Sequence, residues 1–316
     1  MTTAATNLFG LDRAGLESFF AGLGEPAYRA KQVMRWVYRF GVTDFAAMTD
    51  LSRGLRAQLA QVAEICPPQV LAEEQAADGT RKWLLGVAGD RGSDAIEAVY
   101  IPERERATLC VSSQVGCALD CSFCATGKQG LSRNLSAAEI IGQAWFAEHG
   151  LRTAAHAAGQ RAISNVVFMG MGEPLANYRN LVPALRILLD DFGFGLSKRR
   201  VTVSTSGLVP FMDRLRTQVD VALAVSLHAA DDTLRNELVP INRKYPLEQL
   251  MAACDRYTAG KERRAHVVYE YVLLDGVNDR PEHAANLVRL LGQRAAKVNL
   301  IPFNPHPGSA YRRPAP

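Results

Sequence analysis

The sequence has 316 residues, which is long enough for one large domain or for a large domain with a smaller companion. Hydrophobic residues make up 48% and charged residues 22%, a composition typical of a soluble globular protein with a substantial core. The apolar runs are too short to span a membrane, and the N-terminus lacks the features of a secretory signal, so we expect a cytoplasmic protein. The net charge of +4 is compatible with a polyanionic partner without establishing one.

Residues 1–66 are predicted to form an N-terminal helical domain. One helix covers Pro26–Phe40, because proline is tolerated at a helical start and Gly41 ends the segment. A second helix covers Arg53–Glu64 and ends before the prolines that begin at Pro67.

The first of these helices carries a basic stripe. Lys31, Arg35 and Arg39 recur at every fourth residue, and the interleaved aromatic residues are Tyr28, Trp36, Tyr38 and Phe40. Basic groups could meet RNA phosphates, and exposed rings could stack on unpaired bases. A solvated basic face beside an aromatic core stripe is an equally good interpretation. Residues 1–64 hold seven Lys and Arg against six Asp and Glu, so the stripe is local.

Residues 67–104 are predicted to form a small β extension. Lys82–Val87 and Ala95–Ile101 are rich in strand-forming residues, and the pairs Asp78-Gly79 and Gly89-Asp90 are turn signals. We therefore expect a short antiparallel meander here.

Residues 105–316 alternate between apolar strands and helices. The expected strands are Ala107–Ser112, Ser164–Met169, Val201–Ser204, Val221–Leu227, Val267–Leu274 and Val298–Ile301. The expected helices are Ala137–His149, with Ser136 and Glu139 as a capping box, Asn180–Asp190, Pro210–Thr217, Pro246–Tyr257 and Pro281–Leu291. Such alternation implies a parallel sheet in an α/β fold, and six units are too few for an eight-unit barrel. We expect an open or partial barrel, with its site at the carboxyl ends of the strands.

Three cysteines in eight residues are the strongest chemical signal. Cys117, Cys121 and Cys124 form a C-x3-C-x2-C loop just after the first barrel strand, and three thiolates can bind three corners of a cubic iron–sulfur cluster. The fourth iron is then open to another ligand. The alternative is structural zinc, which normally needs four protein ligands, and the loop contains no histidine.

This loop resembles that of the radical S-adenosylmethionine (SAM) superfamily, whose members combine the same cysteine spacing with a partial (β/α)6 barrel. The resemblance implies a [4Fe-4S] cluster whose open iron chelates the amino and carboxylate groups of SAM. It also implies that one electron cleaves the sulfonium to give methionine and a 5′-deoxyadenosyl radical.

Further motifs follow the other strands. Gly172 and Glu173 lie in a turn after the second strand, where glycine permits close backbone approach and a carboxylate can receive an ammonium group. Alone this turn is a plain loop, but one strand after the cysteines it resembles the SAM-binding Gly-Glu motif of the superfamily. The remaining cofactor-binding candidates at strand ends are Ser204, Ser226, Leu227, His228 and Asn304.

These polar groups have an ordinary interpretation as well. A lone serine or histidine is usually a cap or a satisfied core group, but the shared strand-end position favours hydrogen bonds to the carboxylate and ribose of SAM. The amide of Asn304 could read the adenine edge of SAM.

Longer stretches resemble the RlmN/Cfr family of radical SAM RNA methyltransferases: Ala107–Cys117, Gly127–Gly130, Met169–Pro174, Ser197–Thr202, Ser226–His228 and Asn236–Tyr245. The likeness covers essentially the whole chain. It implies methylation of adenine C2 in 23S rRNA and certain tRNAs, with two SAM molecules per turnover. We also expect an electron donor such as flavodoxin, no membrane partner, and a monomer as the default oligomeric state. Cfr-like methylation of adenine C8 is the alternative, and the Asn236–Tyr245 stretch favours C2.

Adenine C2 lies between two ring nitrogens and is too electron-poor to attack a sulfonium methyl group, which explains the need for radicals. In the family, one SAM methylates a cysteine, and a second gives the deoxyadenosyl radical that abstracts hydrogen from this S-methyl group. The resulting carbon radical adds to C2 to form a covalent enzyme–RNA intermediate, and a second cysteine assists its resolution. The resemblance assigns the resolving cysteine to Cys110 and the proton acceptor to Glu97. Without it, they are a buried strand thiol and a solvent-facing strand residue.

The methyl-carrying cysteine should follow the sixth strand. The one thiol after Cys124 is Cys254, in a predicted helix, which we interpret as a packing residue. The sequence ends at Pro316, so the C-terminal barrel segment is expected to be truncated. A chain without the methyl-carrying cysteine could be a catalytically impaired form that still binds RNA and SAM. A non-catalytic RNA-binding protein with a zinc or structural cysteine site is the rival from another class.

Overall fold

The computed structural model describes residues 5–89, 92–152, 161–261 and 265–315. The chain divides into two compact units, which are described separately. Unit 1 comprises residues 1–113, 134–170 and 179–201, and unit 2 comprises residues 114–133, 171–178 and 202–316. In the described ranges, no helix is both long and apolar enough to cross a membrane.

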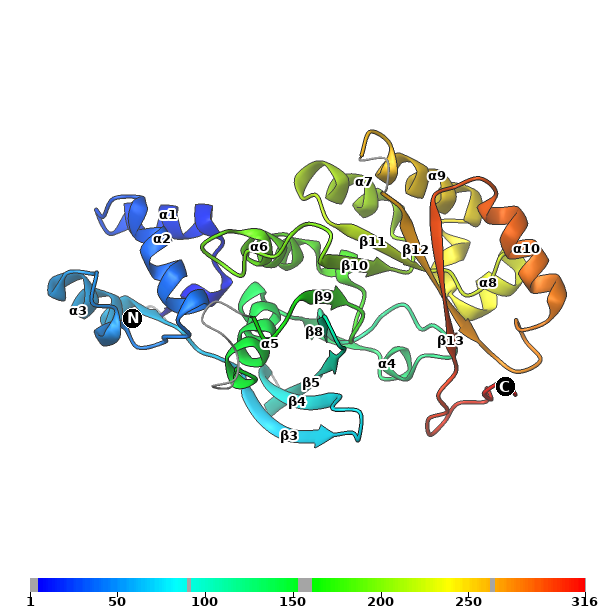
Figure 1. Cartoon of the computed structure of the whole chain (residues 1–316), viewed down its shortest axis with the longest axis horizontal. Helices are drawn as coiled ribbons and strands as arrows, with labels where there is room; N and C mark the ends of the chain where they lie inside the picture. Colours follow the sequence, from blue (N-terminus) through cyan, green and yellow to red (C-terminus); the bar gives the residue numbers. More distant parts are fainter. Residues whose placement is uncertain (1–4, 90–91, 153–160, 262–264, 316) are drawn as a thin grey trace. The chain divides into compact units, whose positions relative to one another are not determined.

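Unit 1 begins with the predicted N-terminal helices (Figure 1). They are α1 (Arg13–Gly22), α2 (Tyr28–Met34), which continues as a π-helix over Arg35–Arg39, and α3 (Arg53–Val62). The helix expected over Pro26–Phe40 is confirmed, but its second half widens to π geometry. The helix expected to reach Glu64 ends at Val62, because the last two residues form the short strand β2 (Ala63–Glu64) and pair with β1 (Thr6–Asn7).

The β extension is an antiparallel meander, as predicted. Its strands are β3 (Gln69–Gln75), β4 (Arg81–Gly89) and β5 (Gly92–Pro102). The last two are longer than the expected Lys82–Val87 and Ala95–Ile101, and β5 also pairs antiparallel with β6 (Ala107–Cys110). The first barrel pair of unit 1 is β6 with β9 (Asn165–Phe168), which run parallel. The Asp78-Gly79 turn forms with a φ of +85° at the glycine, whereas Asp90 lies outside the described residues.

Two helices complete unit 1. The capping box predicted for α5 (Ala137–Gly150) is confirmed, because the Glu139 amide donates to Ser136 Oγ at 3.2 Å and the Ser136 amide donates to Glu139 Oε2 at 2.8 Å. The other helix, α6 (Tyr178–Leu189), follows β9. Trp145 Nε1 on α5 donates to the carbonyl oxygen of Val37 at 2.8 Å, so the N-terminal helices are fastened to α5.

Unit 2 contains four parallel strands in the order β10–β11–β12–β13 (Figure 1). They are β10 (Val201–Thr205), β11 (Ala222–Ser226), β12 (Val267–Leu273) and β13 (Ala296–Pro302). The helices between them along the chain are α7 (Val209–Gln218), α8 (Asp232–Leu238), α9 (Leu247–Thr258) and α10 (Pro281–Leu291). With β6 and β9 these make the six predicted strands. Helix α8, too short for a periodic pattern, was not predicted.

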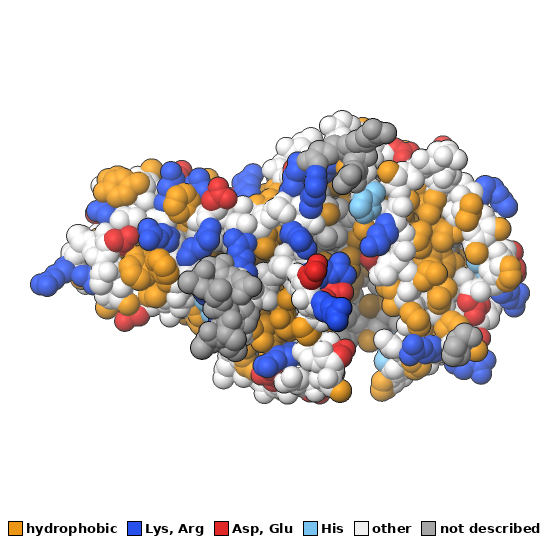
Figure 2. Space-filling model, in the orientation of Figure 1, with side chains coloured by type: hydrophobic (Ala, Val, Ile, Leu, Met, Phe, Trp, Pro, Cys, Tyr) orange, Lys and Arg blue, Asp and Glu red, His pale blue; other side chains and the backbone are white. Residues whose placement is uncertain are grey.

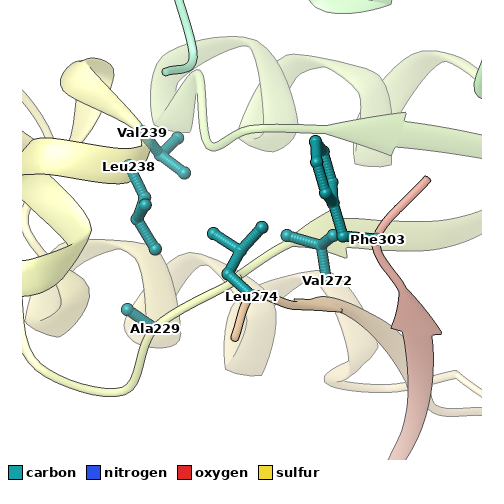
Figure 3. Packing of buried hydrophobic residues seen from close by; sticks show 6 residues of the cluster. All are labelled: Ala229, Leu238, Val239, Val272, Leu274 and Phe303. Atoms are coloured by element: carbon teal, nitrogen blue, oxygen red, sulfur yellow. The ribbon is translucent and has the colours of Figure 1, made fainter. Parts of the chain in front are cut away.

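A short two-stranded sheet, β7 (Gln114–Gly116) with β8 (Leu131–Asn134), frames the cysteine loop and the single-turn helix α4 (Ala125–Lys128). A hydrophobic cluster lies at the carboxyl ends of the unit 2 strands, and Figure 3 shows its side chains from α8, β12 and the segment after β13. Its buried members are Ala229, Leu238, Val239, Val272, Leu274 and Phe303. Cys121 and Phe123 pack against it, so the cluster supports the cysteine loop.

Candidate functional site

The parallel register of unit 2 gathers the predicted cofactor-binding residues at one sheet edge. Thr205 pairs with Val225, and Ser226 pairs with Glu270, so β10, β11 and β12 end near one another. Ser204 is buried at the end of β10, and Ser226 is the last residue of β11. Serine residues therefore lie at the carboxyl ends of two neighbouring strands, where the strand-end argument predicts a binding site.

The cysteine loop is held in place by three contacts within unit 2. The Ser122 amide donates to the carbonyl oxygen of Leu238 at 3.1 Å, and the Ser122 hydroxyl lies 2.8 Å from Tyr311 Oη. His306 Nε2 lies 3.1 Å from the carbonyl oxygen of Phe123. The loop thus has a defined backbone conformation between two of its cysteines.

The thiols of Cys117, Cys121 and Cys124 are free and partly buried. Burial raises the pKa of Cys121 to about 12, and the neighbouring thiols of Cys124 and Cys117 raise it further. Burial also raises the pKa of Cys117. The raised pKa values keep Cys117 and Cys121 neutral at physiological pH, and coordination of iron would favour their thiolate forms.

These thiols fit a cluster better than a single ion. Within the described ranges, no three His, Cys, Asp or Glu side chains converge as ligands of one metal ion. A cubic cluster binds each thiolate to a different iron atom, so its ligands need not meet at one point. Three partly buried thiols on one short loop, close enough for Cys124 and Cys117 to act on Cys121, suit the cluster.

The carboxylate of Glu173 joins the Gly-Glu loop to the end of β10. Its Oε1 accepts the Leu175 amide at 3.0 Å, and its Oε2 accepts the Ser206 amide at 2.8 Å. The side chain is buried, which raises its pKa to about 7. No basic side chain in the described part of the chain forms an ion pair with it. A carboxylate has room for further donors, so the ammonium of an amino acid would stabilise its charged form.

Gly172 has a φ of +93°, and a Cβ there would lie 2.5 Å from the Cβ of Gln114. Gln114 is itself fixed, because its Oε1 accepts the Glu173 amide at 2.8 Å. The residue at position 172 must therefore be glycine for two reasons, backbone conformation and space.

We expect Gly172→Ala to lower the free energy of unfolding by more than about 2 kcal/mol, because an unfavourable φ and a backbone-level clash add. It should also weaken SAM binding, since Glu173 would move. The matched control is Gly260→Ala, where φ is +75° but no atom lies within 4 Å of the new Cβ. Urea unfolding and SAM titration of both variants check this; equal effects would refute the steric account.

His228 is buried, with a φ of +61°. Its Nδ1 accepts the Val272 amide at 3.0 Å, and its ring packs edge-on against Phe123 with centroids 4.7 Å apart. Burial, and then the charge of Arg235, lowers its pKa to about 3. The ring is therefore neutral at physiological pH, and Nε2 carries the remaining proton as a possible donor to a ligand.

This histidine makes stability fall on acidification. Between its unfolded pKa of 6.5 and its folded pKa of about 3, the unfolded state binds a proton that the folded state rejects. Lowering the pH from about 7 to about 5 should therefore cost about 2 kcal/mol of unfolding free energy through His228. His228→Asn, which tolerates the positive φ, should remove most of this difference in urea unfolding. An unchanged pH dependence in the variant would contradict the assignment.

Leu227 and Asn304 occupy different environments. The Leu227 side chain is buried, so only its backbone can meet a ligand, while its own carbonyl oxygen accepts from Arg235 Nε at 3.0 Å. Asn304 follows β13 and is exposed.

Arg235 is a buried residue that sequence reasoning missed. Its Nη2 donates to the carbonyl oxygens of Ser206 at 2.8 Å and Ser226 at 3.1 Å, and its Nη1 donates to Asn242 Oδ1 at 2.7 Å. Together with the bond to Leu227, one guanidinium group ties the ends of β10 and β11 together. The available signal was its place next to the Asn236–Tyr245 stretch, which contains its partner Asn242.

Glu97 and Cys110 belong to unit 1, apart from the other predicted site residues in the division of the chain. Glu97 on β5 is exposed, 3.6 Å from Lys82 Nζ. Cys110 ends β6, and burial raises its pKa to about 11, so it is a protonated thiol. Cys254 is buried in α9, in agreement with a packing role.

Two family models match the chain. The ribosomal RNA large subunit methyltransferase N-terminal domain covers residues 6–65, and the radical SAM superfamily covers residues 111–288. The "Dual-specificity RNA methyltransferase RlmN" of Xanthomonas axonopodis pv. citri (strain 306) is 56% identical, over 97% of this chain and 78% of that protein. The protein of the same name from Pseudomonas putida (strain W619) is 54% identical, over 99% and 81%.

A solved structure supports the same family assignment. The crystal structure of a radical SAM methyltransferase from Sphaerobacter thermophilus is 47% identical and matches with a TM-score of 0.88, over 98% of this chain and 89% of that one. The predicted fold class is thereby confirmed, because a radical SAM methyltransferase shares the architecture. Sequence identity of this extent over nearly the whole chain establishes the family: the chain belongs to the RlmN family of radical SAM RNA methyltransferases.

Proposed function

We propose that the protein methylates C2 of adenine in 23S ribosomal RNA and in transfer RNA, using two SAM molecules per turnover. The observation that carries the proposal is that three partly buried thiols lie near a buried carboxylate, Glu173, which forms no ion pair with a basic side chain of the described residues. The Glu173 charge acts on both Cys117 and Cys121, so the cluster-binding loop and the Gly-Glu loop are neighbours. The dual specificity named for the Xanthomonas and Pseudomonas relatives supports RNA substrates.

The cofactors are a [4Fe-4S] cluster and SAM, as in the radical SAM superfamily. Cys117, Cys121 and Cys124 would hold three irons, and the cluster would supply the electron that cleaves SAM. Glu173 accepts the ammonium group of SAM, and Gly172 lets the backbone come close to it. Hydrogen bonds to the carboxylate and ribose come from Ser204, Ser226, the Leu227 backbone and His228, and Asn304 reads the adenine edge.

Glu97 and Cys110 are proposed to act on the RNA adduct, as the family resemblance implies. Burial raises the pKa of Cys110 to about 11, so a base must remove its proton before the thiolate can react. The exposed carboxylate of Glu97 is accessible for proton transfer. The methyl-carrying cysteine is not assigned to any of these 316 residues.

We further propose that residues 1–66 bind RNA, that residues 67–104 are an extension, and that residues 105–316 form the catalytic core. A small electron-transfer protein such as flavodoxin supplies the electron. The protein acts as a monomer in the cytoplasm, where its RNA substrates lie.

The proposal is tested by incubating the protein anaerobically with unmodified RNA, SAM and a reductant, and by identifying methylated nucleosides by mass spectrometry. 2-Methyladenosine is the expected product. 8-Methyladenosine would instead support the Cfr-like alternative and contradict C2 methylation. SAM cleavage without a methylated nucleoside would show that these residues suffice for the cofactor reaction and not for methyl transfer.

A further inference from the structure

Unit 1 contains a small cavity, and no residue of the cysteine loop lines it. It lies where the end of the N-terminal π-helix, the end of α5 and the segment after α6 meet. Its volume is about 60 Å³, and its lining residues are Tyr38, Arg39, Glu148, Arg152, Arg161, Gly193 and Phe194. Figure 2 shows Lys and Arg side chains gathered in the region of α2 and α6 of this unit.

The lining carries three guanidinium groups and one carboxylate. Glu148 is buried, and its Oε2 already accepts the Ile163 amide at 3.0 Å. Among the described residues, no acidic side chain forms an ion pair with Arg39, Arg152 or Arg161. Instead, Arg39 Nη2 donates to the carbonyl oxygen of Asp191 at 2.5 Å, and Arg152 Nη1 donates to the carbonyl oxygen of Arg39 at 3.4 Å. The one carboxylate of Glu148 acts on Arg161, so three guanidinium groups face a single negative charge and the lining keeps an excess of positive charge.

Two of the guanidinium groups converge on one point. Gly195 has a φ of +57°, and a Cβ there would lie 3.0 Å from Arg161 Nη2 and 3.4 Å from Arg39 Nη2. Burial and the charge of Arg39 lower the pKa of Arg161, a sign that the two groups repel each other. Like charges held together beside a cavity are stabilised by an anion placed between them.

We propose that Arg39, Arg152 and Arg161 bind a phosphate group of the RNA substrate, an inference that rests on the proposed function. Guanidinium forks match phosphate oxygens in geometry, and the small cavity suits a phosphate better than a nucleobase. Arg39 and Arg152 are exposed, so a phosphate that belongs to a long polymer can reach them. The site combines Arg39 of the N-terminal domain with Arg152 and Arg161, which follow α5 in the chain, and all three belong to unit 1.

The test is the salt dependence of tRNA binding, measured by fluorescence anisotropy with the cluster-loaded protein. Each of R39Q, R152Q and R161Q should reduce the slope of log affinity against log salt by about 0.7 to 0.9, the contribution of one phosphate contact, and weaken binding about three- to tenfold. R161K keeps the charge and loses the fork, so its slope should stay near wild type. The control is R106Q, because Arg106 is exposed and paired with Glu103, and its slope should not change.

Unchanged slopes in all three glutamine variants with folded spectra would overturn the proposal. So would equal slope losses in R106Q, which would indicate a diffuse charge effect. The second arm of the test measures binding of inorganic phosphate to the wild type by thermal shift. If phosphate binds while the salt slopes of tRNA binding stay unchanged in the glutamine variants, the site takes a free anion and its role in RNA binding is refuted. Formation of 2-methyladenosine in RNA by the wild type at saturating RNA tests the proposed function separately, so the two failures are distinguishable.

Discussion

Cys121→Ala is expected to abolish cluster binding and SAM cleavage. Cys121 is one of three protein ligands, and two thiolates cannot hold a cubic cluster with an open iron. After anaerobic reconstitution, the iron content should fall from about four atoms per chain to background. The yield of 5′-deoxyadenosine should fall to background with it.

The loss should not be due to unfolding. Cys121 packs only at the edge of the hydrophobic cluster, so circular dichroism of the variant should match the wild type. Cys66→Ala is the control, because Cys66 is an exposed free thiol outside the loop, and it should keep iron and activity. A Cys121→Ala protein that retains a full cluster would refute the ligand assignment.

Arg235→Met is expected to have the second largest effect, a fall of about 3 to 5 kcal/mol in the free energy of unfolding. Methionine fills similar space but donates no hydrogen bond. Three strand-end carbonyl oxygens and Asn242 Oδ1 would then be buried without their donor. Urea unfolding measures this loss. SAM affinity should fall as well, because Arg235 positions Ser206 and Ser226.

Two comparisons separate this role from a general effect of charge. Arg235→Lys keeps the charge but cannot reach all four acceptors, so it should lie between wild type and Arg235→Met. Arg256→Met removes an exposed arginine paired with Asp213 and should cost less than about 1 kcal/mol. A loss below about 1 kcal/mol in Arg235→Met would contradict the positioning role.

Local patterns accounted for much of the fold. The capping box at Ser136, the glycine stop at Gly41 and the six apolar runs act over a few residues, so they can be recognised in the sequence. Because parallel strands share one sheet edge, the same runs also predicted that Ser204, Ser226 and His228 would gather. The cysteine spacing is equally local.

The other features depend on tertiary contacts. Arg235 joins the carbonyl oxygen of Ser206, 29 residues away, to those of the neighbouring strand end, and its helix α8 is only seven residues long. The π geometry of Arg35–Arg39 and the short strand at Ala63–Glu64 arise where the N-terminal helices pack, so helical propensity alone did not predict them. Roles for Glu97 and Cys110 came only from family resemblance, since an exposed acid and a buried thiol are ordinary in strands.

The basic stripe of the N-terminal helix shows both of its interpretations. Tyr38 is buried and donates to the carbonyl oxygen of Phe9 at 3.1 Å, so it belongs to the core. Tyr28 and Phe40 are exposed, with the guanidinium of Arg29 over the Tyr28 ring and that of Arg35 over the Phe40 ring, an arrangement compatible with RNA contact. Arg39 lines the basic cavity of unit 1, which the helical spacing alone could not indicate because its partners come from α5 and the segment after α6.

The most direct test of the account is the formation of 5′-deoxyadenosine by the reconstituted protein. The chain is purified anaerobically, loaded with iron and sulfide, and supplied with SAM and a reductant. We predict 5′-deoxyadenosine and methionine in the wild type and neither product in Cys121→Ala. A wild-type protein that binds iron at these cysteines and does not cleave SAM would contradict the account.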